Sequence, residues 1–112
     1  MSVLVTGVAG FIGSSTARAL LARGEQVVGI DNLNNYYDPS LKQARLDALS
    51  RDFGDRFHFE RIDFSDASAL EDLGRTSDFD RIVHLGAQAG VRYSLENPGA
   101  YIQTNLVGFA NV

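Results

Sequence analysis

The sequence predicts an α/β domain in which a parallel sheet carries helices on both faces. Four short apolar runs, rich in β-branched and aromatic residues, alternate with stretches of helical periodicity along the 112 residues. Three of these runs lack a clean alternation of polar and apolar residues, as is typical of strands covered on both faces. Proline, glycine and capping residues stand at the ends of the helical stretches. The predicted order is therefore β-α-β-α-β-α-β-α, joined by right-handed crossovers.

The four strands are predicted from the apolar runs. We expect them at residues 2–6 (SVLVT), 26–30 (QVVGI), 57–62 (FHFERI) and 80–85 (DRIVHL). A doubly wound sheet built in this way has the spatial order 3-2-1-4, which places the first strand between the second and the fourth.

The first two helices follow from their end signals. The first, residues 11–23, is expected to end at Gly24, because glycine favours the C-terminal cap. The second, residues 39–51, begins with Pro39, which suits a first helical turn. The small and apolar side chains expected on one face of the second helix are Leu41, Ala44 and Ala48.

The last two helices are also predicted from their end signals. Ser65 or Asp66 is expected to cap the third helix, which should end at Gly74. Asn97-Pro98 opens the fourth, which should continue to the end of the chain. The apolar stripe expected along the fourth helix consists of Ile102, Leu106 and Phe109.

Composition excludes several classes of protein. A hydrophobic content of 45% with 21% charged residues is ordinary for one globular domain. The net charge of −4 argues against nucleic acid or an anionic membrane surface as a partner. The chain has no cysteine, and its two histidines, His58 and His84, lack neighbours at ligand spacing, so no metal site is predicted. No run approaches a signal peptide or a membrane span, and we expect a cytoplasmic protein.

Three glycines lie in "VTGVAGFIGSS", residues 5–15, between the first strand and the first helix. This context is the one that a dinucleotide-binding fingerprint requires, and it predicts a Rossmann-type sheet. Gly7 would allow the sharp turn, Gly10 would leave room for a pyrophosphate, and Gly13 would let the helix pack closely on the strand. The N-terminus of the helix would attract the phosphates. The alternative is a tight turn without a ligand.

Two acidic residues stand where the second and third strands end. Asp31 would accept hydrogen bonds from the hydroxyls of an adenosine ribose and would repel a 2′-phosphate, which favours NAD over NADP. Its alternative role is to cap the following loop. Asp63 would accept a hydrogen bond from the adenine amino group, with Phe64 enclosing the ring, or else would cap the third helix. After the fourth strand, small residues in "HLGAQAG" would let the cofactor approach the backbone, or would simply pack tightly.

These features resemble the N-terminal part of the extended short-chain dehydrogenase/reductase family, the NAD-dependent epimerases and dehydratases. The pattern Thr-Gly-x-x-Gly-x-x-Gly of that family matches Thr6 to Gly13. The stretches "GIDNLNNYYDPSLKQARL" and "HLGAQAGVRYSLENP" resemble the sugar-nucleotide branch, above all the UDP-glucuronate 4-epimerases. This chain has Ser14-Ser15 where the family often has histidine, and Gly86 where alanine is usual. Neither departure removes a phosphate donor, because those donors are backbone groups.

The resemblance implies further positions in the cofactor site. Asn32 and Asn34 would lie near the ribose and phosphates, and Asn105 would reach toward the nicotinamide half or else form a hydrogen bond within its helix. Arg92 would face the substrate, with a surface salt bridge as its alternative. The complete expected set for NAD is Gly7, Gly10, Phe11, Ile12, Gly13, Asp31, Asn32, Asn34, Asp63, Phe64, Leu85, Gly86, Ala87 and Asn105.

Catalysis in the resembling family needs a tyrosine four residues before a lysine, as general base and charge partner. None of the four tyrosines here has that spacing, since Tyr37 precedes Lys42 by five residues. We therefore expect residues 1–112 to form an NAD-binding half-domain, truncated after the fourth βα unit, with no catalytic residue of its own. A UDP-sugar would bind only in the longer parent enzyme.

Two alternatives remain open at this point. One is a non-catalytic NAD-binding module that senses the cofactor, and the other is a Rossmann-type methyltransferase, whose ligand has no pyrophosphate. In every case the fourth strand would present an unprotected edge, and the last helix would add exposed apolar residues. We expect a homodimer or higher oligomer through one of these surfaces.

Overall fold

The computed structural model describes residues 2–33, 39–87 and 95–112. The strands are β1 (Ser2–Thr6), β2 (Gln26–Asp31), β3 (Phe57–Arg61) and β4 (Arg81–His84). The helices before the fourth strand are α1 (Phe11–Ala22), α2 (Pro39–Phe53), the short 3-10 helix η1 (Gly54–Arg56) and α3 (Ala67–Thr76). The C-terminal helix consists of α5 (Pro98–Tyr101), the π-helical η2 (Ile102–Gly108) and α6 (Phe109–Asn111).

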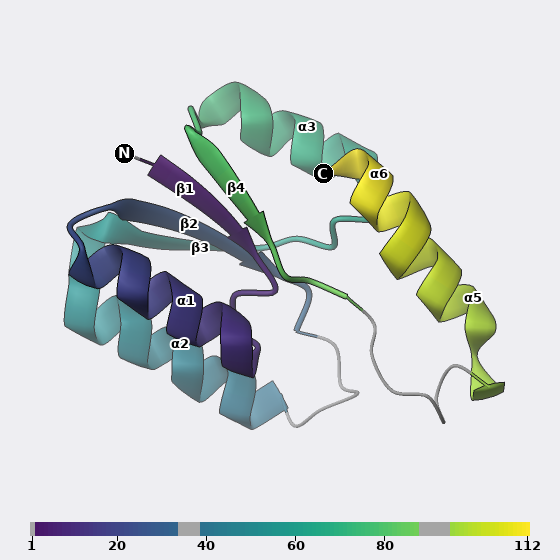
Figure 1. Ribbon diagram of the computed structural model, residues 1–112, viewed down its shortest axis with the longest axis horizontal. Helices are drawn as coiled ribbons and strands as arrows, with labels where there is room; N and C mark the ends of the chain where they lie inside the picture. The colour runs from purple at the N-terminus through teal and green to yellow at the C-terminus, as the bar shows by residue number, and fades with distance from the viewer. Residues whose placement is uncertain (1, 34–38, 88–94) are drawn as a thin grey trace.

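The four strands form one parallel sheet in the order β3-β2-β1-β4, which confirms the predicted topology. The central strand β1 pairs with both neighbours, so that Val5 lies between Gly29 of β2 and Val83 of β4. In a parallel sheet all carboxyl ends meet at one edge, and every loop that follows a strand starts there. The four loops that carry the predicted site residues therefore begin close together (Figure 1).

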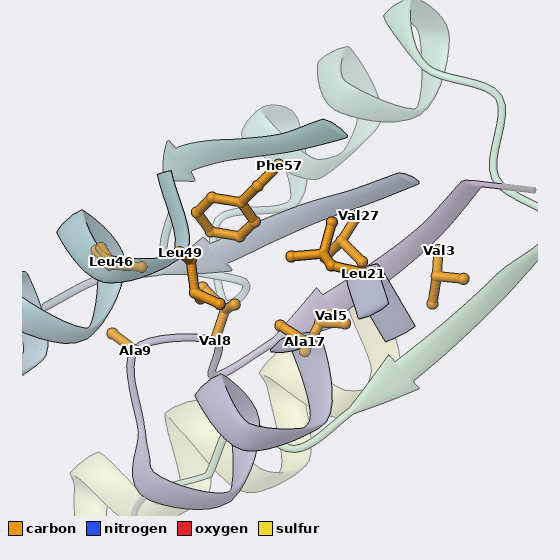
Figure 2. Close-up of a cluster of buried hydrophobic side chains, with 10 residues drawn as sticks. All are labelled: Val3, Val5, Val8, Ala9, Ala17, Leu21, Val27, Leu46, Leu49 and Phe57. Atoms are coloured by element: carbon orange, nitrogen blue, oxygen red, sulfur yellow. The ribbon is translucent and has the colours of Figure 1, made fainter. Parts of the chain in front are cut away.

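Each face of the sheet has its own hydrophobic core. On one face, α1 and α2 cover the strands, and α3 with the C-terminal helix covers the other (Figure 1). Figure 2 shows the first core, with Val3, Val5, Val8, Ala9, Ala17, Leu21, Val27, Leu46, Leu49 and Phe57. The second core contains Leu4, Ile30, Phe64 and Leu73. Val3 and Val5 of β1 enter the first core and Leu4 enters the second, so the middle of the strand is apolar on both faces, as predicted.

Two predicted helix features are wrong. Gly74 does not end α3. The residue keeps a helical conformation and the helix continues to Thr76. A glycine inside a helix costs only about 1 kcal/mol relative to alanine, so a helix can continue through it. In α2 the predicted face of Leu41, Ala44 and Ala48 is not the buried one. The buried side chains are Lys42, Leu46 and Leu49, which also recur at helical spacing.

The C-terminal helix starts as predicted, with the Asn97 side chain accepting a hydrogen bond from Ala100 N. The predicted stripe does not face the core, since Ile102 is 55% and Leu106 is 66% exposed. The helix instead approaches the sheet through buried Gly108, where an added Cβ would overlap the ring of Phe64. The wider π-helical turn changes the angular spacing on which the predicted stripe depended. The side chain of Phe109 lies outside the described residues.

Candidate functional site

A cavity of about 510 Å³ lies at the carboxyl edge of the sheet, where the four loops begin. Its walls come from the glycine loop and first turn of α1, from the residues after β2, β3 and β4, from α2 and from η2. The lining residues are Gly7, Gly10, Phe11, Ile12, Gly13, Asp31, Asn32, Leu41, Lys42, Arg45, Asp63, Phe64, Leu85, Gly86, Ala87 and Thr104. Its volume falls in the ordinary range for cofactor sites, about 300–1,000 Å³.

Most of the residues predicted for the cofactor site line this one cavity. Asn105 does not, although its neighbour Thr104 does, and the Asn105 side chain is exposed on the C-terminal helix. Asn34 and Arg92 lie outside the described residues, so the structure does not place them.

The three glycines have distinct local environments. Gly7 has a left-handed φ of 68°, and its N–H donates to Ile30 O at 3.0 Å, which turns the chain sharply at the end of β1. A Cβ at Gly13 would overlap Gly7 O, so only glycine lets α1 start this close to the turn. A Cβ at Gly10 would touch only Gly7 O, at 3.2 Å, and the position otherwise opens into the cavity.

The start of α1 offers unpaired donors to this open space. The first N–H groups of a helix have no partner within the helix, and α1 has no side-chain cap and no acidic residue in its first turn. Phe11, Ile12 and Gly13, which carry these N–H groups, all line the cavity. The arrangement therefore suits an anionic group above Gly10.

Asp31 fastens the glycine loop to the end of β2. Its Oδ2 accepts a hydrogen bond from Ala9 N at 3.1 Å, and its Oδ1 accepts one from Leu33 N at 2.9 Å. The loop-capping alternative is thus present in the structure. It does not use up the carboxylate, which offers about four acceptor positions. Asp31 therefore still has capacity for ribose hydroxyls at the cavity wall.

Asp63 and Phe64 form the wall after β3. Asp63 Oδ1 accepts hydrogen bonds from the backbone and side chain of Ser65, at 2.9 and 2.7 Å. The cap of α3 is Asp66, whose Oδ1 accepts from Ala69 N, so the helix-capping alternative for Asp63 is wrong. A Cβ at Gly86 would overlap the ring of Phe64. This contact explains why glycine, the unusual residue at position 86, fits here.

Four lining residues were not predicted from the sequence: Leu41, Lys42, Arg45 and Thr104. Lys42 is only 8% exposed, and Arg45 Nη1 donates to Ala9 O at 3.0 Å. The sequence did contain an indication of the position of Lys42. It shares helical spacing with Leu46 and Leu49, and a lysine on an apolar helix face is unusual. These two cations stand on the α2 side of a cavity that Asp31 and Asp63 also line.

The described residues were also compared with the requirements of a metal site and of a membrane span. No group of three His, Cys, Asp or Glu side chains there could hold a metal ion. Among the same residues, no helix is long and apolar enough to cross a membrane.

Comparisons with known proteins point to one family. A family model described as GDP-mannose 4,6 dehydratase matches residues 4–112. UDP-glucuronate 4-epimerase 3 of Arabidopsis thaliana is 50% identical over 99% of this chain and 25% of its own length. The chain spans about a quarter to a third of the length of the relatives that it matches.

Solved structures give the same result. UDP-glucuronic acid 4-epimerase from Bacillus cereus, in complex with UDP-glucuronic acid and NAD, has a TM-score of 0.82 and 34% identity. This match covers 99% of our chain and 34% of that one. UDP-glucose 4-epimerase of Thermus thermophilus, in complex with NAD, has a TM-score of 0.78 and 35% identity over 99% of this chain and 32% of that one. The predicted cofactor, NAD, is thus the one bound in these neighbours.

The glycine loop, the acidic strand ends and the fold agree with the family match over almost the entire chain. The predicted resemblance to NAD-dependent epimerases and dehydratases is confirmed: the chain belongs to the family of GDP-mannose 4,6-dehydratase.

Proposed function

We propose that this chain is the NAD-binding part of a sugar-nucleotide epimerase, and that the whole protein acts as a UDP-glucuronate 4-epimerase. The observation that carries the proposal is that the glycine loop, Asp31 and the Asp63–Phe64 wall line the same cavity. The similarity to UDP-glucuronate 4-epimerases supports the substrate.

The cavity suggests how the cofactor lies. The pyrophosphate would sit above Gly10, next to the first N–H groups of α1, where no described side chain lies within 4 Å of an added Cβ. The adenosine would extend between Asp31 and Asp63, and the nicotinamide half toward Ala87 and Thr104. Lys42 and Arg45 would partly balance the negative charge of the phosphates.

Asp31 is the basis for choosing NAD over NADP. Its carboxylate is held at the cavity wall by two backbone donors, so it cannot turn away from a 2′-phosphate without losing both hydrogen bonds. Arg45 donates one hydrogen bond to Ala9 O in the glycine loop, so part of its guanidinium is already occupied.

The chemistry divides between cofactor and protein. NAD, when bound, supplies a reversible hydride acceptor. The residues of this chain bind and orient it, and we assign no catalytic group to residues 1–112, since none of the tyrosines has the required lysine. We therefore expect the 112-residue chain to show no interconversion of UDP-glucuronate and UDP-galacturonate. General-base catalysis contributes about 10²- to 10⁴-fold, and measurable turnover by the purified chain would contradict this assignment.

Binding is tested by calorimetric titration with NADH. Gly10→Val should abolish binding with little change in far-UV circular dichroism, because the side chain would occupy the open space at the α1 N-terminus. Gly74→Val is the matched control, since Gly74 has nothing within 4 Å of an added Cβ and lies on α3, outside the cavity. Full affinity in the Gly10 variant would mean that the glycines serve only the turn. Preferential binding of S-adenosylmethionine would contradict the proposed NAD site.

We also propose that the chain self-associates through β4 and the C-terminal helix. Within the described residues β4 pairs only with β1, so its other edge has backbone groups without a strand partner. Ile82 on β4, and Ile102 and Leu106 on the C-terminal helix, are exposed apolar side chains. A second copy of the chain would cover both. A cytoplasmic location stays a prediction from the sequence.

A further inference from the structure

The Thr6 side chain, at the end of β1, joins β1 to the loop after β4. The residue is fully buried, and its Oγ1 accepts hydrogen bonds from Leu85 N at 2.9 Å and Gly86 N at 3.0 Å. The same oxygen lies 2.6 Å from His84 Nδ1. A hydroxyl group has two acceptor positions and one proton. With both positions occupied by backbone N–H groups, the proton must go to His84.

This arrangement determines the state of the histidine. His84 Nδ1 has to accept the hydrogen bond, so the ring is neutral and its proton is on Nε2. Partial burial also lowers the pKa of His84 below its ordinary value, which favours the same neutral form. The hydroxyl of Thr6 and the ring of His84 therefore determine each other's hydrogen-bonding roles.

The groups held by this pair form part of the cavity wall. Leu85 and Gly86, whose N–H groups point at Thr6, both line the cavity. Gly86 is packed between Gly7 and Phe64, since a Cβ there would meet both. The ring of Phe64, another lining residue, meets the ring of His84 edge to face, with centroids 5.0 Å apart. A change in the protonation of His84 therefore acts on Phe64 through ring contact and on Gly86, next to Gly7, through Thr6.

We propose that Thr6 and His84 are positioning residues for the cavity wall that hold it only while His84 is neutral, so that affinity for NAD falls when His84 is protonated. The proposal rests on the proposed NAD-binding function. A protonated His84 would turn Nδ1 into a donor, and Thr6 Oγ1 would then face three donors with two acceptor positions. Either the hydrogen bond from Leu85 or Gly86 breaks, or the imidazolium moves away and displaces Phe64.

Among the described residues, no charged group near His84 offsets this effect. β1 faces the ring with uncharged Thr6, and the stretch after β3 faces it with Phe64. Asp63, next to Phe64, is exposed and accepts from Ser65, and Arg81 on β4 is exposed. On the α6 side, Asn111 donates to the carbonyls of Phe64 and Ser65. Burial is the cause of the lowered pKa of His84, without a contribution from any described charge.

The test compares NADH affinity at about pH 8 and about pH 5.5, by calorimetry, in the wild type and two variants. His84→Asn replaces Nδ1 by an amide oxygen that accepts the Thr6 proton but does not titrate. The wild type should lose about three- to tenfold in affinity at the lower pH, the range expected for one hydrogen bond. The affinity of His84→Asn for NADH should be the same at about pH 5.5 as at about pH 8, because the amide does not titrate in this range.

His58→Asn is the matched control, because the other histidine is exposed, lies on β3 and pairs with Glu60 at 2.8 Å. It should keep the wild-type pH dependence. Equal pH dependence in the wild type and His84→Asn would overturn the proposal.

Nuclear magnetic resonance provides a readout that does not depend on NAD. The ¹⁵N shifts of His84 should show an unprotonated Nδ1 at about pH 8, and the amide signals of Leu85 and Gly86 should shift as His84 titrates. A proton on Nδ1 at that pH would contradict the proposal. If the wild type bound no NADH at that same pH, the proposed function would fail, while these signals would still decide whether the pair holds the wall.

Discussion

The α1–α2 side of the sheet and the β4 side differ in how completely they are covered. Leu21 and Val5, in the first core, are fully buried, and Leu49 is 1% exposed. On the other side, Ile82 of β4 is 49% and Leu106 of the C-terminal helix is 66% exposed. Yet both sides contribute to the same cavity. The α1–α2 half is well packed and supplies the glycine loop, whereas the β4 half is open and leaves apolar groups exposed.

The largest expected difference between the two halves is the loss of stability when a leucine is replaced by alanine. Leu21→Ala should destabilise the chain by about 2–5 kcal/mol, since it leaves a cavity in the first core. Leu95→Ala, at a position that is 82% exposed, should change the free energy of unfolding by less than about 0.5 kcal/mol. Urea denaturation measures both. Similar losses in the two variants would show that the C-terminal half is packed as tightly as the first core.

Removal of the Asp31 carboxylate, in the well-packed half, should weaken cofactor binding. Asp31→Ala should weaken NADH binding by about 1.5–3 kcal/mol, the range for hydrogen bonds to a charged group, and should narrow the preference for NADH over NADPH. Calorimetry with both cofactors measures this effect. Asp47→Ala, on the exposed face of α2 where Asp47 accepts from Gln43, is the control. Equal affinity of the wild type for both cofactors would contradict the assigned role of Asp31.

The oligomeric state in solution tests whether the open half is a contact between two copies of the chain. Light scattering at micromolar concentration should give a mass at least twice the 12.2 kDa of one chain. Burial of apolar area contributes about 25 cal/mol per Å² before the costs of association, so a single charge placed in the contact should matter. Ile82→Lys should shift the mass toward the monomer, and Leu41→Lys, an equally exposed change on α2, should not. A monomeric wild type would rule out the proposed contact.

The smallest expected effect is on stability as a function of pH. Because the pKa of His84 is lowered in the folded chain, the unfolded chain binds more protons, and stability falls as the pH drops below about 6.5 toward the folded pKa. Above about 6.5 this contribution is fully present. Unfolding in urea at several pH values should show the decline in the wild type. His84→Asn should remove that part of the slope, and an unchanged slope would mean that other groups cause it.

The geometry of the glycine loop was predictable because its residues are close together in the sequence. Gly7, Gly10 and Gly13 stand at a strand–helix junction, where their spacing already limits the backbone that can form. Asp31 and Asp63 follow predicted strands, and parallel pairing brings such ends to one edge. The role of Lys42 was not predicted, because the burial of a helix face depends on how the helix packs against the sheet.

The sequence by itself determined the strand order, the glycine turn and the family, since each follows from periodicity or from motifs within a few residues. Only the tertiary structure decided which face of α2 is buried, how the π-helical C-terminal segment meets Phe64, and that Thr6, at the end of the first strand, holds the loop after the fourth. These features depend on side-chain packing between segments far apart in the chain, which local patterns do not encode.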